Sequence, residues 1–193
     1  MDFSLVSFVI TIRRFIGLLL TPYKTMRKIT AEGTYKDLTW IYFFSFLYFF
    51  LSGNVRMEIG GILTMIVLIL FSVVFFSLLP SNEAIARKWQ TVWITWTYTL
   101  FPTIIWFYTT LIFYLILPPP RTTSFMGMLF SIFYIGFSIS LLAWKLILVY
   151  LSIRFSLKAH IYRVFYYFLL YITLSVPIWI ILYRMGISRV PFV

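Results

Sequence analysis

A single lysine is the most unusual candidate for chemistry in this chain, because it lies inside a long apolar run. Lys145 follows Trp144 and is the one charged residue within the segments expected to cross a membrane. A charge at that depth is costly and often marks a functional site. The alternative is snorkelling: Lys145 lies six residues from its expected helix end, about 9 Å along the helix, and its stem can carry the ammonium to the headgroups. We favour snorkelling, because no acid in an expected span pairs with it.

Hydroxyl groups surround a proline in a neighbouring apolar run. Tyr98 and Thr99 precede Pro102, and Thr103 follows it. Proline lacks the N–H that a helix uses, and nearby threonine hydroxyls can satisfy the carbonyl that it leaves free in lipid. Broken helices also line transport sites, where the interruptions come in pairs from related halves of the chain. Without that pairing we expect a structural kink, and a small-solute site formed by these residues and Lys145 is the alternative.

Residues for catalysis or metal binding do not gather in this sequence. All five acids lie outside the expected spans: Asp2, Glu32, Asp37, Glu58 and Glu83. The one histidine, His160, stands near Lys158 and Arg163 without a carboxylate or a second histidine beside it, and the chain has no cysteine. A metal site or a general base needs such a cluster. We therefore expect no enzyme, no cofactor, no metal site and no proton relay of carboxylates.

The elements that must position these residues are membrane helices. Apolar residues make up 62% of the 193 residues and charged residues 11%, whereas soluble domains are nearer to about half and a quarter. The sequence therefore predicts an all-α, polytopic transmembrane helix bundle. Hydrophobic runs near spanning length predict five spans, at about 38–53, 60–79, 92–117, 124–151 and 164–183. We expect basic interfacial and cytoplasmic helices over 1–36 and the five-span domain over 37–193.

The first apolar segment, 3–20, carries two adjacent arginines, Arg13 and Arg14. A spanning helix would bury them at a cost of about 2.5–3.5 kcal/mol each. Its polar residues fall at helical spacing in one narrow stripe: Ser4, Ser7, Thr11 and Arg14. This pattern predicts an interfacial amphipathic helix, with the stripe toward water and the apolar face in lipid. A sixth span, which would place the N-terminus outside, is the alternative.

A short basic helix is expected next. Thr21 suits its N-cap, Pro22 its first position and Gly33 a left-handed end. The basic residues of this helix and of the preceding segment predict a contact surface for anionic lipid headgroups or for a partner: Arg13, Arg14, Lys24, Arg27 and Lys28. We favour headgroups, because each basic residue near an anionic surface contributes about 1 kcal/mol.

The distribution of basic residues predicts the orientation in the membrane. With five spans, eleven of the sixteen Lys and Arg residues lie in the N-terminal region and the second and fourth loops, and four lie on the opposite side. The positive-inside rule then places the N-terminus in the cytoplasm and the C-terminus outside. The net charge of +11 is explained in this way, and nucleic acid is not an expected partner.

Two pairs of small residues recur in the fourth expected span. Gly127 and Ser131 are four residues apart, and so are Gly136 and Ser140. Small residues at this spacing let helix backbones approach closely. The pattern predicts a packing face, either within the chain or against another membrane subunit.

Several loosely spaced features follow the order of a known family. They are a basic L-x-P-x-x-T-x-x-x-I segment, a Tyr-Thr-Leu-Phe-Pro run in the third span and a Trp-Lys-Leu-Ile-Leu run before a basic loop: Leu20, Pro22, Thr25, Ile29, 98–102, 144–148 and 154–163. This order, over about 15–183, resembles the Ypt-interacting-protein (Yip) domain family of five-span membrane proteins. In eukaryotes the family is tied to Golgi trafficking and small GTPases, and some prokaryotic relatives act as accessory partners of ABC-type transporters.

The resemblance implies a protein without catalytic activity. The chain lacks the long polar N-terminal region of the eukaryotic members, which favours the prokaryotic kind and a prokaryotic cell membrane. We therefore expect an accessory or scaffold subunit of a larger membrane complex, for example of a transporter. The alternatives are a small-solute transport subunit with a site near Pro102 and Lys145, and a lipid-handling or membrane-shaping protein.

Overall fold

The computed structural model describes residues 5–56, 59–80, 85–116 and 124–185, and within these ranges the chain is helical and contains no strand. Eight helices follow one another in the described part of the chain: α1 (Leu5–Leu20), α2 (Pro22–Glu32), α3 (Tyr35–Arg56), α4 (Ile59–Leu78), α5 (Ile85–Tyr98), α6 (Phe101–Ile116), α7 (Phe125–Leu157) and α8 (Ile161–Arg184). The predicted all-α class is confirmed. Ser4 and the acids Asp2, Glu58 and Glu83 lie outside the described residues.

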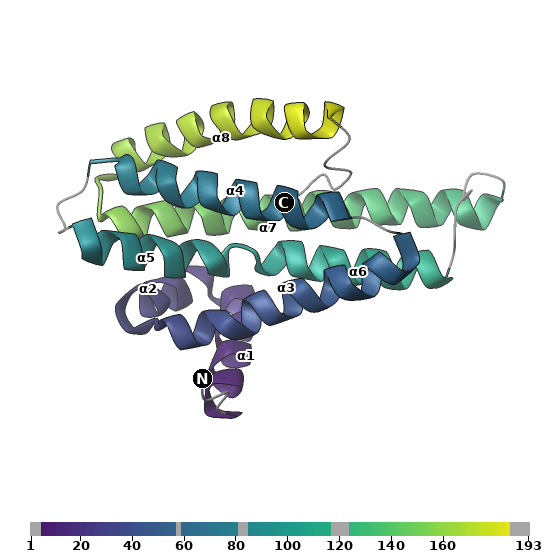
Figure 1. The fold of residues 1–193 in the computed structure, drawn as a ribbon, viewed down its shortest axis with the longest axis horizontal. Coiled ribbons are helices and arrows are strands. Elements are labelled where there is room, and N and C mark those ends of the chain that lie inside the picture. Colours follow the sequence, from purple (N-terminus) through teal and green to yellow (C-terminus); the bar gives the residue numbers. More distant parts are fainter. Residues whose placement is uncertain (1–4, 57–58, 81–84, 117–123, 186–193) are drawn as a thin grey trace.

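Helices α3 to α8 run roughly along the long axis of the molecule (Figure 1). The longest, α7, contacts α2, α5, α6 and α8, while α5 and α6 follow each other end to end. Helix α8 lies along the outer edge of the bundle, and α1 runs across its direction on the opposite side (Figure 1). The arrangement separates a bundle of long helices from an N-terminal helix at a steep angle to them.

Three helical segments are long and apolar enough to cross a membrane, as judged by length and composition: Trp89–Ile116, Phe125–Leu157 and Ile161–Arg184. Two shorter apolar helices, Leu38–Leu51 and Met65–Leu78, accompany them in the described residues. A hydrocarbon core of about 30 Å needs roughly 20 residues of helix. The structure thus shows a helical membrane-type protein, and the count of five spans stays a prediction.

Aromatic side chains fill the core between the long helices. Tyr48 of α3 stacks on Phe107 of α6, with ring centroids 4.3 Å apart and planes at 6°. Phe76, Trp96 and Tyr171 bring α4, α5 and α8 together, with centroid separations of 5.0–5.1 Å. Such ring pairs add about 0.5–1.5 kcal/mol each beyond the area that they bury. These ring contacts hold α5 and α6 against their neighbours in the bundle.

The helix break lies at Thr99 and Leu100, two residues earlier than the predicted kink at Pro102. The amides of Thr99 and Leu100 donate to Trp96 and Thr97 carbonyls at 2.9 and 3.1 Å, which makes a tighter turn than an α-helix. Pro102 is then the second residue of α6. Proline is well tolerated there, because the first N–H groups of a helix have no acceptor within the helix. The expected interruption is therefore present directly before the proline, and Pro102 itself lies in the first turn of α6.

The polar stripe of α1 faces the protein, so the expectation that it faces water is wrong. Ser7 and Thr11 are buried. The Ser7 hydroxyl donates to the Lys36 carbonyl at 3.3 Å, and the Thr11 hydroxyl to the Ser7 carbonyl at 2.9 Å. The stripe is narrow enough for a few protein acceptors to satisfy it, which leaves the apolar residues outside. These exposed residues are Leu5, Val6, Val9, Ile10, Ile12, Ile16, Leu19 and Leu20.

Helix α2 has the expected bounds but different ends. Thr21 makes no side-chain cap, and its hydroxyl lies 3.4 Å from the Gly17 carbonyl oxygen. Gly33 is extended, at φ −65° and ψ 138°, so its predicted left-handed conformation is wrong. A Cβ at Gly33 would lie 2.6 Å from Cγ2 of Ile94. That Cβ would also clash with the Ile29 carbonyl oxygen, so glycine is required by the close approach of its own helix end and of α5, and not by the backbone angle.

Candidate functional site

The structure brings together the intramembrane residues that the sequence singled out. Lys145 of α7 directs its ammonium to the first turn of α6, where Nζ donates to Thr103 Oγ1 at 2.9 Å. Thr103 is buried, and Lys145 is partly buried. Pro102 and Thr103 line a small hollow together with Lys145. The lysine thus makes a contact across the bundle at the helix break, whereas the snorkelling interpretation sends the ammonium to the headgroups.

Tyr98 is the last residue of α5, and Thr99 lies in the break between α5 and α6. The Tyr98 hydroxyl accepts from Nη1 of Arg14 at 3.1 Å, and the guanidinium lies 5.9 Å from the ring centroid. The Thr99 hydroxyl donates to the Trp96 carbonyl at 2.7 Å. Thr99 therefore has the structural role expected of hydroxyls at a break, and Tyr98 receives a cation from α1.

Aromatic contacts connect the two cationic side chains. Phe15 of α1 stacks on Phe101, the first residue of α6, with centroids 3.9 Å apart and planes at 15°. The Phe101 ring in turn meets the ring of Trp144, the neighbour of Lys145, edge to face at 5.4 Å. The break is thus enclosed by α1 on one side and α7 on the other. Arg14, predicted to contact lipid or a partner, is directed here to Tyr98.

A larger cavity opens beside Lys145, between α4, α7 and α8. It has a volume of about 250 Å³ and is lined mostly by apolar side chains: Leu68, Leu142, Lys145, Leu146, Val149, Tyr171, Ile172, Ser175, Val176 and Trp179. The Tyr171 hydroxyl lies 3.1 Å from the Ser72 hydroxyl. An apolar pocket with a few polar groups is the usual form of a small-molecule site. Lys145 supplies the single cation of this lining.

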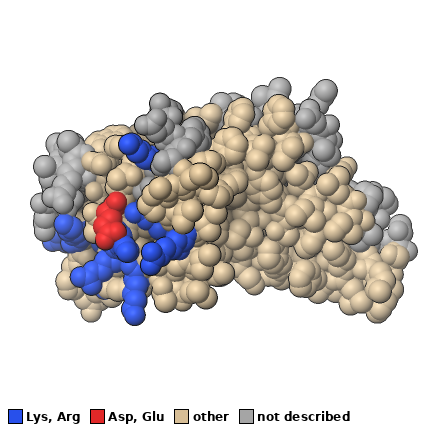
Figure 2. Space-filling view, turned by 90° about the horizontal axis from the view of Figure 1, so that it is seen from below, with Lys and Arg blue, Asp and Glu red and all other residues tan. Residues whose placement is uncertain are grey.

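The other predicted contact residues lie on the surface at one end of the bundle. Arg13, Lys24, Arg27 and Lys28 are exposed, and Figure 2 shows Lys and Arg side chains gathered at one end of the face that it views. Lys28 pairs with Glu32 at 3.8 Å, with both side chains about 60% exposed. An exposed pair of this kind contributes little, about 0–1 kcal/mol. The end therefore stays strongly positive.

The two small-residue pairs of α7 have different roles. Gly127 is buried and Ser131 is half-buried beside it, with the Ser131 hydroxyl donating to the Gly127 carbonyl at 2.9 Å. Gly136 and Ser140 are exposed, and a Cβ at Gly136 would meet nothing within 4 Å. The first pair belongs to the internal packing face, and the second lies on the surface of the chain.

Sequence reasoning missed the polar contacts between side chains on different helices. Arg14 and Tyr98 are one example. Others are Trp106 Nε1 donating to Ser138 Oγ, and Ser152 Oγ donating to Thr95 Oγ1, each at 3.0 Å. The available signal was the unusual number of hydroxyls within apolar runs, which in lipid find partners on neighbouring helices.

Among the described residues no three His, Asp or Glu side chains lie close enough to hold a metal ion. His160 stacks on Tyr162, with centroids 5.4 Å apart. Comparison of the chain with protein families, with curated proteins and with solved structures gave no match.

Proposed function

We propose that this chain is a non-catalytic integral membrane protein that serves as an accessory or scaffold subunit of a larger membrane complex. The observation that carries the proposal is the outward face of α7. Gly136, Ser140 and Ala143 lie on one exposed side of that helix, and among the described residues no side chain comes within 4 Å of a Cβ at Gly136. A smooth strip of this kind lets a second helix approach closely in lipid.

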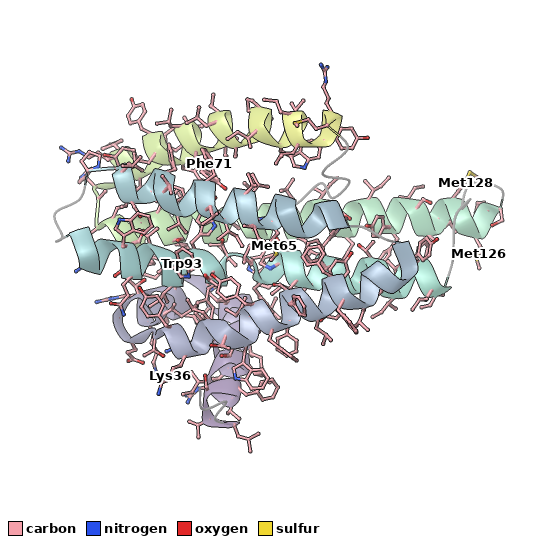
Figure 3. All side chains as sticks on the ribbon, viewed as in Figure 1. Lys36, Met65, Phe71, Trp93, Met126 and Met128 are labelled. Atoms are coloured by element: carbon pink, nitrogen blue, oxygen red, sulfur yellow. The ribbon has the colours of Figure 1, made fainter. Side chains whose placement is uncertain are left out.

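The same part of α7 is apolar on its remaining surface. Ile132, Phe133 and Ile139 flank the small residues and are 60–68% exposed. Figure 3 shows Met126 and Met128 at the far end of the helix, beyond the ends of its neighbours. Apolar exposure alone suits lipid as well as protein. The small residues Gly136, Ser140 and Ala143 favour a helix of another protein, and not lipid alone, as the group that contacts this face.

The proposed orientation places the basic end of the bundle in the cytoplasm and the C-terminus outside, with five spans. Its support is the gathering of Lys and Arg side chains at one end (Figure 2) and the excess of basic residues in cytoplasmic loops. The direction of α1 across the bundle supports its placement in the membrane interface. This topology also fits the Yip resemblance of the prokaryotic kind.

The test is extraction of the full chain from its native membrane in a gentle detergent. A larger membrane complex should copurify with the wild-type protein and be lost with Gly136→Leu, which adds bulk where this chain has space. Thr173→Leu places the same side chain at an exposed position of α8 and should keep the complex. A wild-type protein that emerges alone contradicts the proposal.

A small-solute site is the second candidate, and the cavity of about 250 Å³ beside Lys145 favours it. Its cation and apolar walls suit a small amphipathic anion. Lys145→Met should then abolish solute flux in proteoliposomes while assembly is preserved. Unchanged flux with that variant, or no flux for the wild type, removes this candidate.

Membrane shaping by α1 is the third candidate, favoured by the exposed apolar face of that helix. Val9, Ile16 and Leu19 are 55–61% exposed, whereas Phe8 and Phe15 pack on Trp40 and Phe101. The informative change is therefore Val9, Ile16 and Leu19 to serine. If the helix shapes membranes, the triple variant should deform vesicles less than the wild type does. Deformation equal to that of the wild type excludes the role.

A further inference from the structure

A second and larger cavity lies at the basic end of the bundle, between α2, α5 and α7. Its volume is about 540 Å³, and its lining includes Tyr23, Arg27, Thr30, Thr91, Arg154 and Lys158. Among the described residues that line it there is no Asp or Glu. Three cations from two different helices thus surround one hollow without a described carboxylate in its wall.

The guanidinium of Arg154 is held in place before any ligand arrives. It lies over the ring of Tyr23, 5.3 Å from the centroid, and that ring meets Phe155 edge to face at 5.0 Å. Arg27 lies one helical turn after Tyr23 and is exposed. A guanidinium stacked on an aromatic ring keeps its N–H groups for an acceptor in its own plane. Arg154 is therefore preorganised for an oxyanion.

Lys158 ends α7 in a conformation that is unusual for its residue type. It has φ 46° and ψ 33°, and it is the one non-glycine residue with positive φ among those described. Glycine or asparagine takes this left-handed position at lower cost. Strained residues of this kind persist where the surroundings hold them and cluster at binding sites. Here the strained residue adds a cation to the cavity.

We propose that this cavity binds the phosphate of an anionic lipid headgroup, held by Arg27 and Arg154 with Lys158 beside them. Positive side chains gathered around one hollow favour an anion inside it. Arginine forks match phosphate oxygens with two parallel hydrogen bonds. The volume exceeds that of a phosphate ion and admits the rest of a headgroup. The inference needs no partner subunit, so it goes beyond the accessory role, and it gives the predicted lipid contact of α2 a defined site.

The experiment is native mass spectrometry and titration of the purified full-length protein with dioctanoyl phosphatidylglycerol. Dioctanoyl phosphatidylcholine and inorganic phosphate are the comparison ligands. The wild type should bind phosphatidylglycerol at least about tenfold more tightly than phosphatidylcholine. Arg27→Gln and Arg154→Gln should each weaken this binding about tenfold, since each removes a charge-assisted pair. Lys36→Gln removes one exposed positive charge from α3, outside the cavity and outside the predicted headgroup contact, and should leave binding unchanged.

Arg27 is exposed, so its variant keeps the test valid even where Arg154→Gln fails to fold. Equal loss with Lys36→Gln and Arg27→Gln would mean diffuse attraction to a positive surface and would overturn the site. Equal affinity for phosphatidylcholine would do the same. Inorganic phosphate that binds at this cavity and is not displaced by phosphatidylglycerol would overturn the lipid assignment.

Discussion

Lys145 and Thr103 join α7 to the first turn of α6 through a hydrogen bond of 2.9 Å between Nζ and Oγ1. The bond lies directly after the break at 99–100, where the helix ladder is interrupted. The contact therefore joins α7 to the segment Trp89–Ile116 next to the interruption of its helix. Two substitutions can separate the contribution of the hydrogen bond from the cost of burying the lysine.

Thr103→Val should destabilise the protein by about 1–3 kcal/mol, because a partly buried ammonium loses an acceptor. Lys145→Met keeps the stem and removes the charge together with its cost of burial, so it should be closer to neutral. The free energy of unfolding in mixed micelles measures both. A Lys145→Met variant that is clearly less stable than Thr103→Val would contradict this assignment.

Tyr98→Phe should loosen α1 from the bundle. The variant keeps the ring and removes the hydroxyl that accepts from Arg14, and a hydrogen bond to a charged group contributes about 1.5–3 kcal/mol. Hydrogen exchange of the α1 amides should increase, and Arg14→Gln should have the same effect. Arg13→Gln is the matched control, since Arg13 is exposed. An equal increase with Arg13→Gln would show that general charge, and not this contact, holds α1.

Gly17→Ala should disturb the junction of α1 and α2. A Cβ at Gly17 would lie 2.6 Å from Oγ1 of Thr25, so the two helices must separate or Thr25 must move. The thermal midpoint in detergent should fall, and adding Thr25→Ala should restore much of the loss. Gly136→Ala, with nothing within 4 Å of its Cβ, should be neutral or stabilise by up to about 1 kcal/mol. Similar losses at both glycines would contradict the packing described.

Single cysteines introduced into this cysteine-free chain report the topology. A membrane-impermeant maleimide applied outside should label Arg184→Cys and leave Lys24→Cys unlabelled. Arg56→Cys at the end of α3 decides between five and three spans, because it reaches the outside only if α3 crosses. Labelling of Lys24→Cys in intact cells would reverse the orientation.

Much of the helix pattern can be predicted from hydropathy, because apolar runs near spanning length are long enough to identify a helix from the sequence. The expected span 60–79 matches α4, Ile59–Leu78, and 164–183 lies within α8, Ile161–Arg184. Hydropathy does not say which environment a stripe faces. The stripe of α1 would be polar whether it faced water or the protein. Only packing against α3 and α5 determines that it faces the protein.

Details of the site depend on contacts that spacing cannot predict. Arg14 and Tyr98 are 84 residues apart, and nothing in either segment specifies the other. Gly127–Ser131 and Gly136–Ser140 have the same spacing, yet only the first pair is internal. The two pairs are nine residues apart, and at about 100° per residue they lie on opposite faces of α7. Which of those faces meets the bundle is a property of the assembled fold.

Native mass spectrometry of the protein released from its own membrane tests the central claim most directly. We expect this chain in a stoichiometric complex with a larger membrane protein, and a chain carrying Gly136→Leu released without it. Detection of the wild-type chain as a monomer, with lipid as its one companion, would contradict the accessory role.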